Sequence, residues 1–309
     1  MKLVTFEISG QVRHIGAITD DGMSVVDFTA GSSLPHFASM LGLIDGGGEA
    51  LEQASALFKR AENVLSLTQI RLLAPLPRPR QMRDFLAFEK HLRQARANRH
   101  LIGLGEKKNP ADVEVPAVWY EQPLYYKCNR FSVVGPDTDV VWPSYSDVMD
   151  YELEFGFVTS ACGKDISAQD ARKHIFGYCI FNDFSARDAQ IREMQGQTGP
   201  AKGKDFDTGN VLGPWLVTTD EIPDPYALTM VARVNGEEWS RGSSGEIHHR
   251  FEDMIAHVSK SETIYPGEFF GSGTVGSGCG MELGRFLKAG DIVELEVKGL
   301  GILRNRVTR

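Results

Sequence analysis

Cysteine is scarce in this chain: its 309 residues include only four, spread from position 128 to position 279. No two of them stand in a C-x-x-C arrangement, so the sequence suggests neither a zinc cage nor a redox-active pair. We expect reduced and mostly buried thiols, as in a cytoplasmic protein, at Cys128, Cys162, Cys179 and Cys279.

Long apolar runs are also missing. No stretch reaches the roughly 18 consecutive apolar residues that a membrane-spanning helix needs, so we expect no membrane partner. Residues 1–7 lack the apolar centre of a signal peptide, which again favours a cytoplasmic location.

Positive charge is in deficit. The chain carries 33 Lys and Arg against 41 Asp and Glu, a formal net charge of −8, whereas a nucleic-acid partner would favour a basic surface. We therefore expect no nucleic-acid partner. The deficit does not exclude a small anionic substrate, because one metal ion or a few basic groups can reverse the sign of the charge locally.

The first part of the chain shows short strand patterns, with a break at Gly10, followed by a helical region. The helical region covers residues 34–61 and is interrupted at 46–48. The closely spaced prolines of residues 75–79 forbid both helix and strand ladder, so they read as a stiff linker. We place a domain boundary there, with a small N-terminal β-rich domain over residues 1–74 and a larger domain over residues 75–309.

The larger domain is rich in strand patterns from residue 117 onward, and its polar segment 103–116 reads as a loop or lid. Helices are expected at 83–98, 165–175 and 251–261. The fold class indicated is α+β, mostly β.

Residues 150–157 read Asp-Tyr-Glu-Leu-Glu-Phe-Gly-Phe, an alternation of acidic and apolar side chains. Alternate residues of a strand share a face, so Glu152 and Glu154 would stand together with α-carbons about 6.5–7 Å apart. Two carboxylates at that spacing suit a hard cation such as Mg²⁺ or Ca²⁺. The alternative is an amphipathic strand with a wet acidic face.

Three more residues have the chemistry of a catalytic site, each with a plainer explanation. Asp183 follows the apolar segment 178–181 and could meet the two glutamates at a sheet edge, or form an Asx turn. His91 is a candidate general base, or a surface residue of a charged helix. Lys204 could neutralise a developing enolate or a substrate carboxylate, or lie solvated on a loop.

Taken in order, these motifs resemble those of the fumarylacetoacetate hydrolase family, over roughly residues 75–309. The resemblance implies the family's mixed β-sandwich roll preceded by a small N-terminal domain, and a homodimer. The matching residues are Arg83-Asp-Phe…His91, Asp150-Tyr-Glu-Leu-Glu154, Asn182-Asp-Phe-Ser-Ala-Arg-Asp188, Lys204…Gly213-Pro-Trp215, Gly273-Thr274 and Gly299-Leu-Gly…Asn305.

The resemblance also implies the site residues. A divalent cation, usually Mg²⁺ and sometimes Ca²⁺ or Mn²⁺, would be bound by Glu152, Glu154 and Asp183, with Asp84 as the candidate fourth ligand because it stands seven residues before His91. His91 would act as general base on water, oriented by Glu294. The family's remaining site residues match Lys204 and Gln190 near the metal, and Thr274 and Tyr126 against the substrate.

The implied activity is hydrolysis of a C–C bond in a 1,3-diketone or 2,4-diketo acid of the fumarylacetoacetate or acylpyruvate type, through a metal-bound enolate, as in the catabolism of aromatic compounds. The same scaffold also supports decarboxylation, isomerisation or hydration of a 2-oxo acid such as oxaloacetate. Decarboxylase-like members carry a Glu three residues after the His, where this chain has Gln94, and this favours hydrolysis. A non-enzymatic binding protein is a third hypothesis. We expect residues 93–116 to decide the side group of the substrate.

Overall fold

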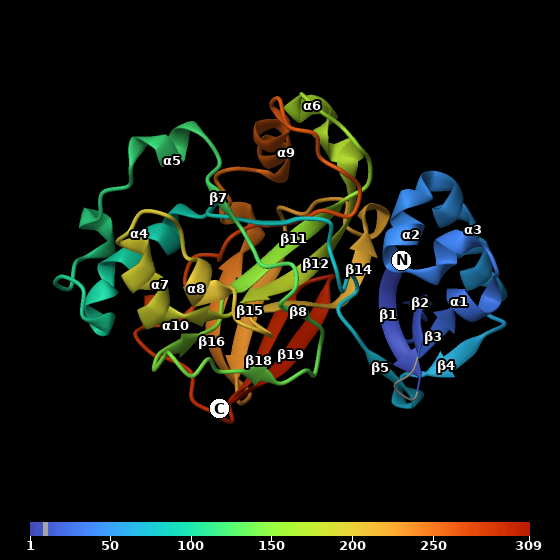
Figure 1. Cartoon of the computed structure of the whole chain (residues 1–309), viewed down its shortest axis with the longest axis horizontal. Helices are drawn as coiled ribbons and strands as arrows, with labels where there is room; N and C mark the ends of the chain where they lie inside the picture. Colours follow the sequence, from blue (N-terminus) through green and yellow to red (C-terminus); the bar gives the residue numbers. More distant parts are fainter. Residues whose placement is uncertain (9–11) are drawn as a thin grey trace.

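The computed structural model describes residues 1–8 and 12–309, so the predicted break at Gly10 lies outside the described residues. The first part of the chain forms strands and helices on one side of the molecule, coloured blue in Figure 1. The expected helical interruption at 46–48 is confirmed as a change of helix at Gly46–Gly47. The elements are β1 (Lys2–Ile8), β2 (Val12–Ile18), β3 (Ser24–Asp27), α1 (Phe28–Gly31), α2 (Met40–Asp45), α3 (Gly47–Arg60), β4 (Val64–Ser66) and β5 (Ile70–Leu72).

One large sheet runs through both parts of the chain, in the order β4-β3-β2-β1-β14-β12-β11-β17-β6-β7, with β5 and β8 joined beside this path. The first part enters it through β1, because Lys2 pairs with Val217 of β14. The boundary at residues 74 and 75 stays a prediction. The other strands of this sheet are β6 (Met82–Phe85), β7 (Tyr125–Lys127), β8 (Val133–Val134), β11 (Leu153–Thr159), β12 (Ile175–Asp183), β14 (Asn210–Thr218) and β17 (Phe269–Gly271).

A second, five-stranded sheet has the order β16-β15-β18-β19-β9. A single buried core joins the two sheets, because Phe155 and Phe157 of β11 belong to the same apolar cluster as Met230 and Leu295. This confirms the α+β class with mixed sheets. The remaining strands are β9 (Val140–Val141), β10 (Met149–Asp150), β13 (Ser185–Ala186), β15 (Thr229–Val234), β16 (Glu237–Ser243), β18 (Ile292–Val297) and β19 (Gly301–Thr308).

Short helices lie around the two sheets (Figure 1). They are α4 (Glu89–Ala97), α5 (Ala117–Glu121), α6 (Ala168–Ala171), α7 (Arg187–Met194), α8 (Ala201–Lys204), α9 (Phe251–Ser259) and α10 (Gly280–Leu283). None of the helices among residues 1–8 and 12–309 is long and apolar enough to cross a membrane.

The helix expected over residues 83–98 is wrong in its first half. The segment Met82–Phe85 is strand β6, held between β17 and β7, and the helix begins only at Glu89. Tertiary contacts override the local pattern here: Arg83 is buried and forms ion pairs with Glu268 and Glu262. The strand therefore fixes the next residue, Asp84, inside the sheet.

Candidate active site

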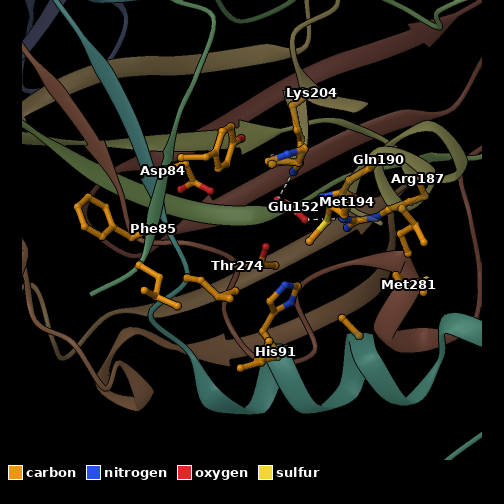
Figure 2. Close-up of a pocket in the computed structure, with 18 of the residues that line it drawn as sticks. Asp84, Phe85, His91, Glu152, Arg187, Gln190, Met194, Lys204, Thr274 and Met281 are labelled. Carbon is orange, nitrogen blue, oxygen red and sulfur yellow. Dashed lines mark hydrogen bonds and ion pairs between the residues drawn. The ribbon is translucent and has the colours of Figure 1, made fainter. Parts of the chain in front are cut away.

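A cavity of about 320 Å³ lies where α4, α7 and α8 meet the large sheet. Figure 2 shows His91 on α4 at one side of it and Lys204 at the other, with Glu152 and Thr274 between them. Part of its wall is apolar, formed by Phe85, Leu86, Leu92, Leu124, Met194 and Met281. The cavity thus combines an apolar surface with a small number of charged groups, as expected for a small-molecule site.

Four carboxylates meet at this cavity, and three of them lie in its lining. One oxygen from each lies within 4.8 Å of the others, and we call Asp84, Glu152, Glu154 and Asp183 the acid cluster. All four are buried, with at most 5% exposure, so the alternative of a wet acidic face at residues 150–157 is wrong. Among the described residues, the buried atoms Glu154 Oε2 and Asp183 Oδ1 have no hydrogen-bond partner.

The strand register explains why these acids meet. Leu153 pairs with Asn182 in the antiparallel strands, so Glu152 and Asp183 occupy neighbouring positions where β11 begins and β12 ends. Asp84 reaches the same place from β6, because it pairs with Gly271 of β17 on one side and with Tyr126 of β7 on the other.

Two basic side chains contact the acid cluster. Lys204 Nζ lies 2.7 Å from Glu152 Oε2 and 2.7 Å from Asp183 Oδ2. An Arg187 guanidinium nitrogen lies 2.7 Å from Glu152 Oε1. The Tyr126 hydroxyl donates a hydrogen bond to Asp183, and the Thr274 hydroxyl donates one to Glu154 at 3.1 Å.

Burial and mutual repulsion separate the pKa values of these acids. Burial raises the pKa of Asp84 and of Glu154 well above the usual range, and the neighbouring carboxylates raise both further. Burial also raises the pKa of Asp183, to about 6, although Lys204 opposes the shift. Burial acts in the same sense on Glu152, but the charges of Lys204 and Arg187 outweigh it and hold the pKa of Glu152 well below its usual range.

The acid cluster fits a divalent cation. Ligand oxygens around one cation at 2.0–2.6 Å lie at most about 4–5 Å from one another, and the cluster's limit of 4.8 Å falls within that range. The oxygens of Glu154 and Asp183 that lack a partner are free to act as ligands. A donor set made only of carboxylates suits Mg²⁺, Mn²⁺ or Ca²⁺.

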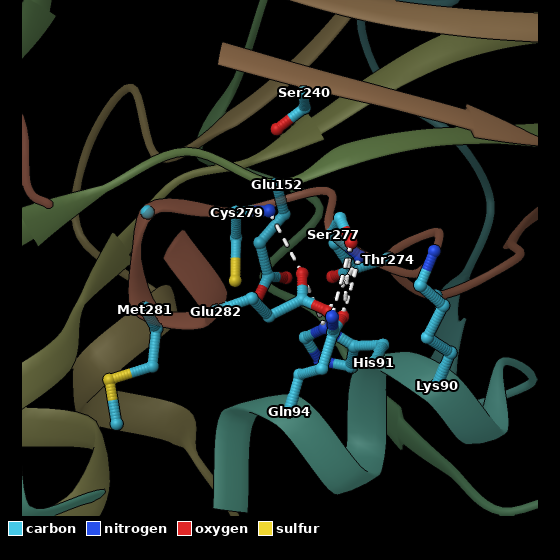
Figure 3. Close-up of polar contacts among 12 residues, drawn as sticks. Lys90, His91, Gln94, Glu152, Ser240, Thr274, Ser277, Cys279, Met281 and Glu282 are labelled. Carbon is cyan, nitrogen blue, oxygen red and sulfur yellow. Dashed lines mark hydrogen bonds and ion pairs between the residues drawn. The ribbon is translucent and has the colours of Figure 1, made fainter. Parts of the chain in front are cut away.

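His91 faces a different glutamate from the one expected. Its Nδ1 lies 3.2 Å from Glu282 Oε2, and we call these two residues the histidine–glutamate pair (Figure 3). The Glu282 carboxylate is fixed in turn by the backbone N–H groups of Ser277, at 2.8 Å, and Cys279, at 3.0 Å. Gln94, also on α4, accepts a hydrogen bond from the Ser277 N–H at 2.9 Å and so ties this loop to the helix.

The prediction that Glu294 orients His91 is wrong. Glu294 lies on β18 of the second sheet, where it pairs with Arg233 of β15 and Arg304 of β19. Its side chain is 30% exposed and lies 3.8 Å from Arg304. Strand alternation causes this, because Leu295 points into the core and its neighbours point away from it. One signal could have found Glu282: it stands three residues after Cys279, at capping-box spacing.

The other expected residues lie at the cavity. Gln190, Thr274 and Tyr126 are in its lining, and Gln190 Oε1 accepts a hydrogen bond from Arg187 at 3.0 Å. Their roles in binding a substrate stay predictions.

Asp150, the acid that begins the segment 150–157, has a structural role. It is fully buried, and it accepts hydrogen bonds from the N–H groups of Gly280, at 2.7 Å, and Met281, at 2.9 Å. It also forms an ion pair with Arg187 at 2.8 Å. Asp150 therefore links the start of α10, which carries Glu282, to the arginine that contacts the acid cluster.

Comparison with known proteins agrees with this architecture. The family model described as fumarylacetoacetate (FAA) hydrolase C-terminal matches residues 81–308. The chain belongs to the fumarylacetoacetate hydrolase family.

Relatives of this family match almost the whole chain. A mitochondrial oxaloacetate tautomerase of Xenopus laevis is 34% identical, and one of Homo sapiens is 33% identical. The matches cover 99% of this chain and 90% and 91% of the two relatives. The solved structure of a fumarylacetoacetate hydrolase from Exiguobacterium antarcticum is 26% identical, with a TM-score of 0.76. The match covers 100% of this chain and 99% of the chain in that solved structure.

We expect Mg²⁺ or Mn²⁺ to raise the melting temperature of the metal-free protein, because a ligand that binds only the folded state stabilises it by about 2.7 kcal/mol at 100 times its Kd. Glu154→Gln should lose most of this rise in a thermal melt, since it removes one carboxylate ligand. Glu294→Gln is the matched control and should keep it. An equally large rise in the melting temperature of Glu154→Gln would contradict the assignment of the acid cluster as a cation site.

We also expect the metal-free protein to lose stability as pH rises. The raised pKa values of Asp84, Glu154 and Asp183 mean that the folded state holds protons more tightly than the unfolded state. The resulting stability is fully present below the unfolded pKa of about 4 and is lost as pH rises through the folded values, about 6 for Asp183. Urea unfolding between about pH 5 and about pH 8 measures the slope, which Glu154→Gln should reduce. Equal slopes in the wild type and in Glu154→Gln would contradict the link between the raised pKa of Glu154 and the pH dependence of stability.

Proposed function

We propose that this protein is a divalent-metal-dependent enzyme that interconverts the keto and enol forms of a 2-oxo acid, by moving a proton at the carbon next to the carbonyl. The observation that carries this choice of reaction is the 34% identity over 99% of the chain to an oxaloacetate tautomerase. The cavity supports it, because a base and a cation site face the same space.

The acid cluster would hold the cation, with Mg²⁺ as the expected ion and Mn²⁺ or Ca²⁺ as alternatives. When bound, such a cation supplies a Lewis acid that polarises the carbonyl of a 2-oxo acid and so acidifies the neighbouring C–H bond. Proton transfer and the stabilisation of developing charge would be carried out by side chains of the protein.

His91 is the proposed base. Its Nδ1 lies 3.2 Å from Glu282 Oε2, which leaves Nε2 as the nitrogen that takes the proton from carbon in the keto form and delivers it to the oxygen of the enolate. The Glu282 carboxylate stabilises the imidazolium formed in between, and its own two backbone hydrogen bonds keep it in place. Removing a general base of this kind costs about 10²–10⁴ in rate.

Lys204 is not suited to be the base. Burial opposes its charge, but the carboxylates of Asp183 and Glu152 outweigh burial and raise the pKa of Lys204, so the amine stays protonated. As a fixed cation it can stabilise negative charge that develops on the substrate oxygen. Gln190 and Thr274 are proposed to add hydrogen bonds to the substrate, and Tyr126 to position Asp183.

Hydrolysis of a C–C bond in an acylpyruvate-type substrate is the second candidate. The histidine–glutamate pair favours it, because the same base can deprotonate a water molecule. A fold shared with a fumarylacetoacetate hydrolase of known structure also supports it. Both reactions pass through an enolate, so the substrate and not the fold decides between them.

An assay with oxaloacetate, acetylpyruvate and fumarylpyruvate separates the candidates. We expect the metal-loaded protein to speed the ultraviolet absorbance change of oxaloacetate keto–enol exchange, without releasing pyruvate from any of the three. Pyruvate release from acetylpyruvate or fumarylpyruvate would favour the hydrolase. CO₂ release from oxaloacetate as the main reaction would favour a decarboxylase.

Substitutions in the histidine–glutamate pair test the base. His91→Ala should lower kcat by about 10²–10⁴, and Glu282→Gln should lower kcat and shift the pH profile while leaving metal affinity unchanged. Glu294→Gln should behave as the wild type. If His91→Ala left every activity unchanged, the assignment would be wrong and the non-enzymatic binding hypothesis would gain support.

The assembly and location stay predictions. We expect a homodimer, which light scattering can measure. The names of the relatives place them in mitochondria, whereas a cytoplasmic location is expected for this chain from its sequence.

A further inference from the structure

The wall of the cavity carries two arginines that the proposed reaction does not use. Arg96 is in the last turn of α4 and Arg99 begins the short 3₁₀ helix that follows, and both side chains are half-buried in the lining of the cavity. We call Arg96 and Arg99 the arginine pair. They come from the segment 93–116 that was expected to decide the side group of the substrate.

Neither member of the arginine pair has an acidic partner. Within residues 1–8 and 12–309, no ion pair involves Arg96 or Arg99, and the buried Nε of Arg96 has no hydrogen-bond partner. The one contact of Arg96 with a protein oxygen is a hydrogen bond of 3.2 Å to the carbonyl of Glu114.

The arginines nearest in environment to this pair are balanced by acids. The two fully buried ones, Arg83 and Arg187, each contact two carboxylates. Arg93, on the same helix as Arg96, pairs with Glu89 at 2.7 Å. The arginine pair is therefore an unbalanced patch of positive charge in a cavity that Asp84, Glu152 and Glu154 also line.

The unbalanced charge is costly to the folded protein. Burial lowers the pKa of Arg96 and of Arg99, and the charge of Arg99 lowers the pKa of Arg96 further. Partial burial of a cation costs less free energy when a counter-charge is present. An anionic ligand would supply the missing partner.

We propose that the arginine pair binds the second carboxylate of a 2-oxo dicarboxylic acid, whose 2-oxo acid end lies at the acid cluster. This rests on the proposed function and adds the substrate class to it. Guanidinium groups bind carboxylates through two parallel N–H donors, and two adjacent guanidiniums select a carboxylate over a neutral group.

The position of Arg96 on α4, with Arg99 just beyond the helix, suits this role. Arg96 follows His91 by five residues, about 7.5 Å along the helix axis at 1.5 Å per residue. Both His91 and Arg96 line the cavity, and side chains of a helix lean toward its N-terminus, which shortens the distance between the two groups. A short diacid can then place one end beside His91 and the other against the arginines.

Binding of oxaloacetate and of pyruvate to the Mn²⁺-loaded protein tests the proposal, because the two acids differ by the second carboxylate. We expect wild type to bind oxaloacetate more tightly than pyruvate. Arg96→Gln and Arg99→Gln should each raise the Kd of oxaloacetate by about 10-fold or more, and should change the Kd of pyruvate by less than about twofold. Arg99→Lys should recover part of the loss. Arg93→Gln removes the same charge from the same helix outside the cavity, and it should change neither affinity.

The outcomes separate this proposal from the proposed function. If wild type binds pyruvate but prefers oxaloacetate no more than pyruvate, the arginine pair does not select a diacid, and the proposed function stands. Equal weakening of both acids in Arg96→Gln and Arg99→Gln would also overturn the proposal, because it would show a general effect on the cavity. If wild type binds neither acid, the proposed function fails and this proposal fails with it.

Discussion

The repulsion among four carboxylates buried in one place is the constraint on which the rest of this structure depends. Carboxylates in a low-dielectric interior oppose both their own burial and one another's charge. Within the part of the chain that the structure describes, the acid cluster has two direct cationic contacts, from Lys204 and Arg187, and Arg187 is shared with Asp150. A folded chain that keeps such a cluster needs either protons or a further cation, and a divalent metal supplies the larger compensation.

The arrangement of strands in the large sheet determines where the four acids meet. The large sheet brings strand ends from distant parts of the chain together, and β6 in particular is held between β17 and β7 so that Asp84 joins acids from β11 and β12. The histidine–glutamate pair is attached to the same framework. Asp150 joins the start of α10 to Arg187, so the histidine–glutamate pair and the acid cluster share a single network of buried contacts.

Much of the site could be predicted because its signals are local. The alternation around Glu152 and Glu154 and the strand that ends at Asp183 are readable from a few residues, and the structure places these acids together. Their burial was not readable, since an alternating acidic strand looks the same at a wet edge and at a buried site.

What the sequence could not supply depends on tertiary contacts. Residues 82–85 have helical character alone, yet two neighbouring strands take them into the sheet. Glu294 and Glu282 both follow plausible motifs, and only the path of the loop after Thr274 decides which one reaches His91. Likewise, nothing in the spacing of Arg96 and Arg99 shows that both face the cavity and lack an acidic partner.

The most direct test of the central claim is anomalous X-ray diffraction from crystals of the protein soaked in Mn²⁺. The account predicts one strong manganese peak among Asp84, Glu152, Glu154 and Asp183, at about 2.0–2.3 Å from their oxygens. The peak should be missing in Glu154→Gln crystals soaked in the same way. A wild-type crystal with no peak at the acid cluster, or with manganese bound only elsewhere, would contradict it.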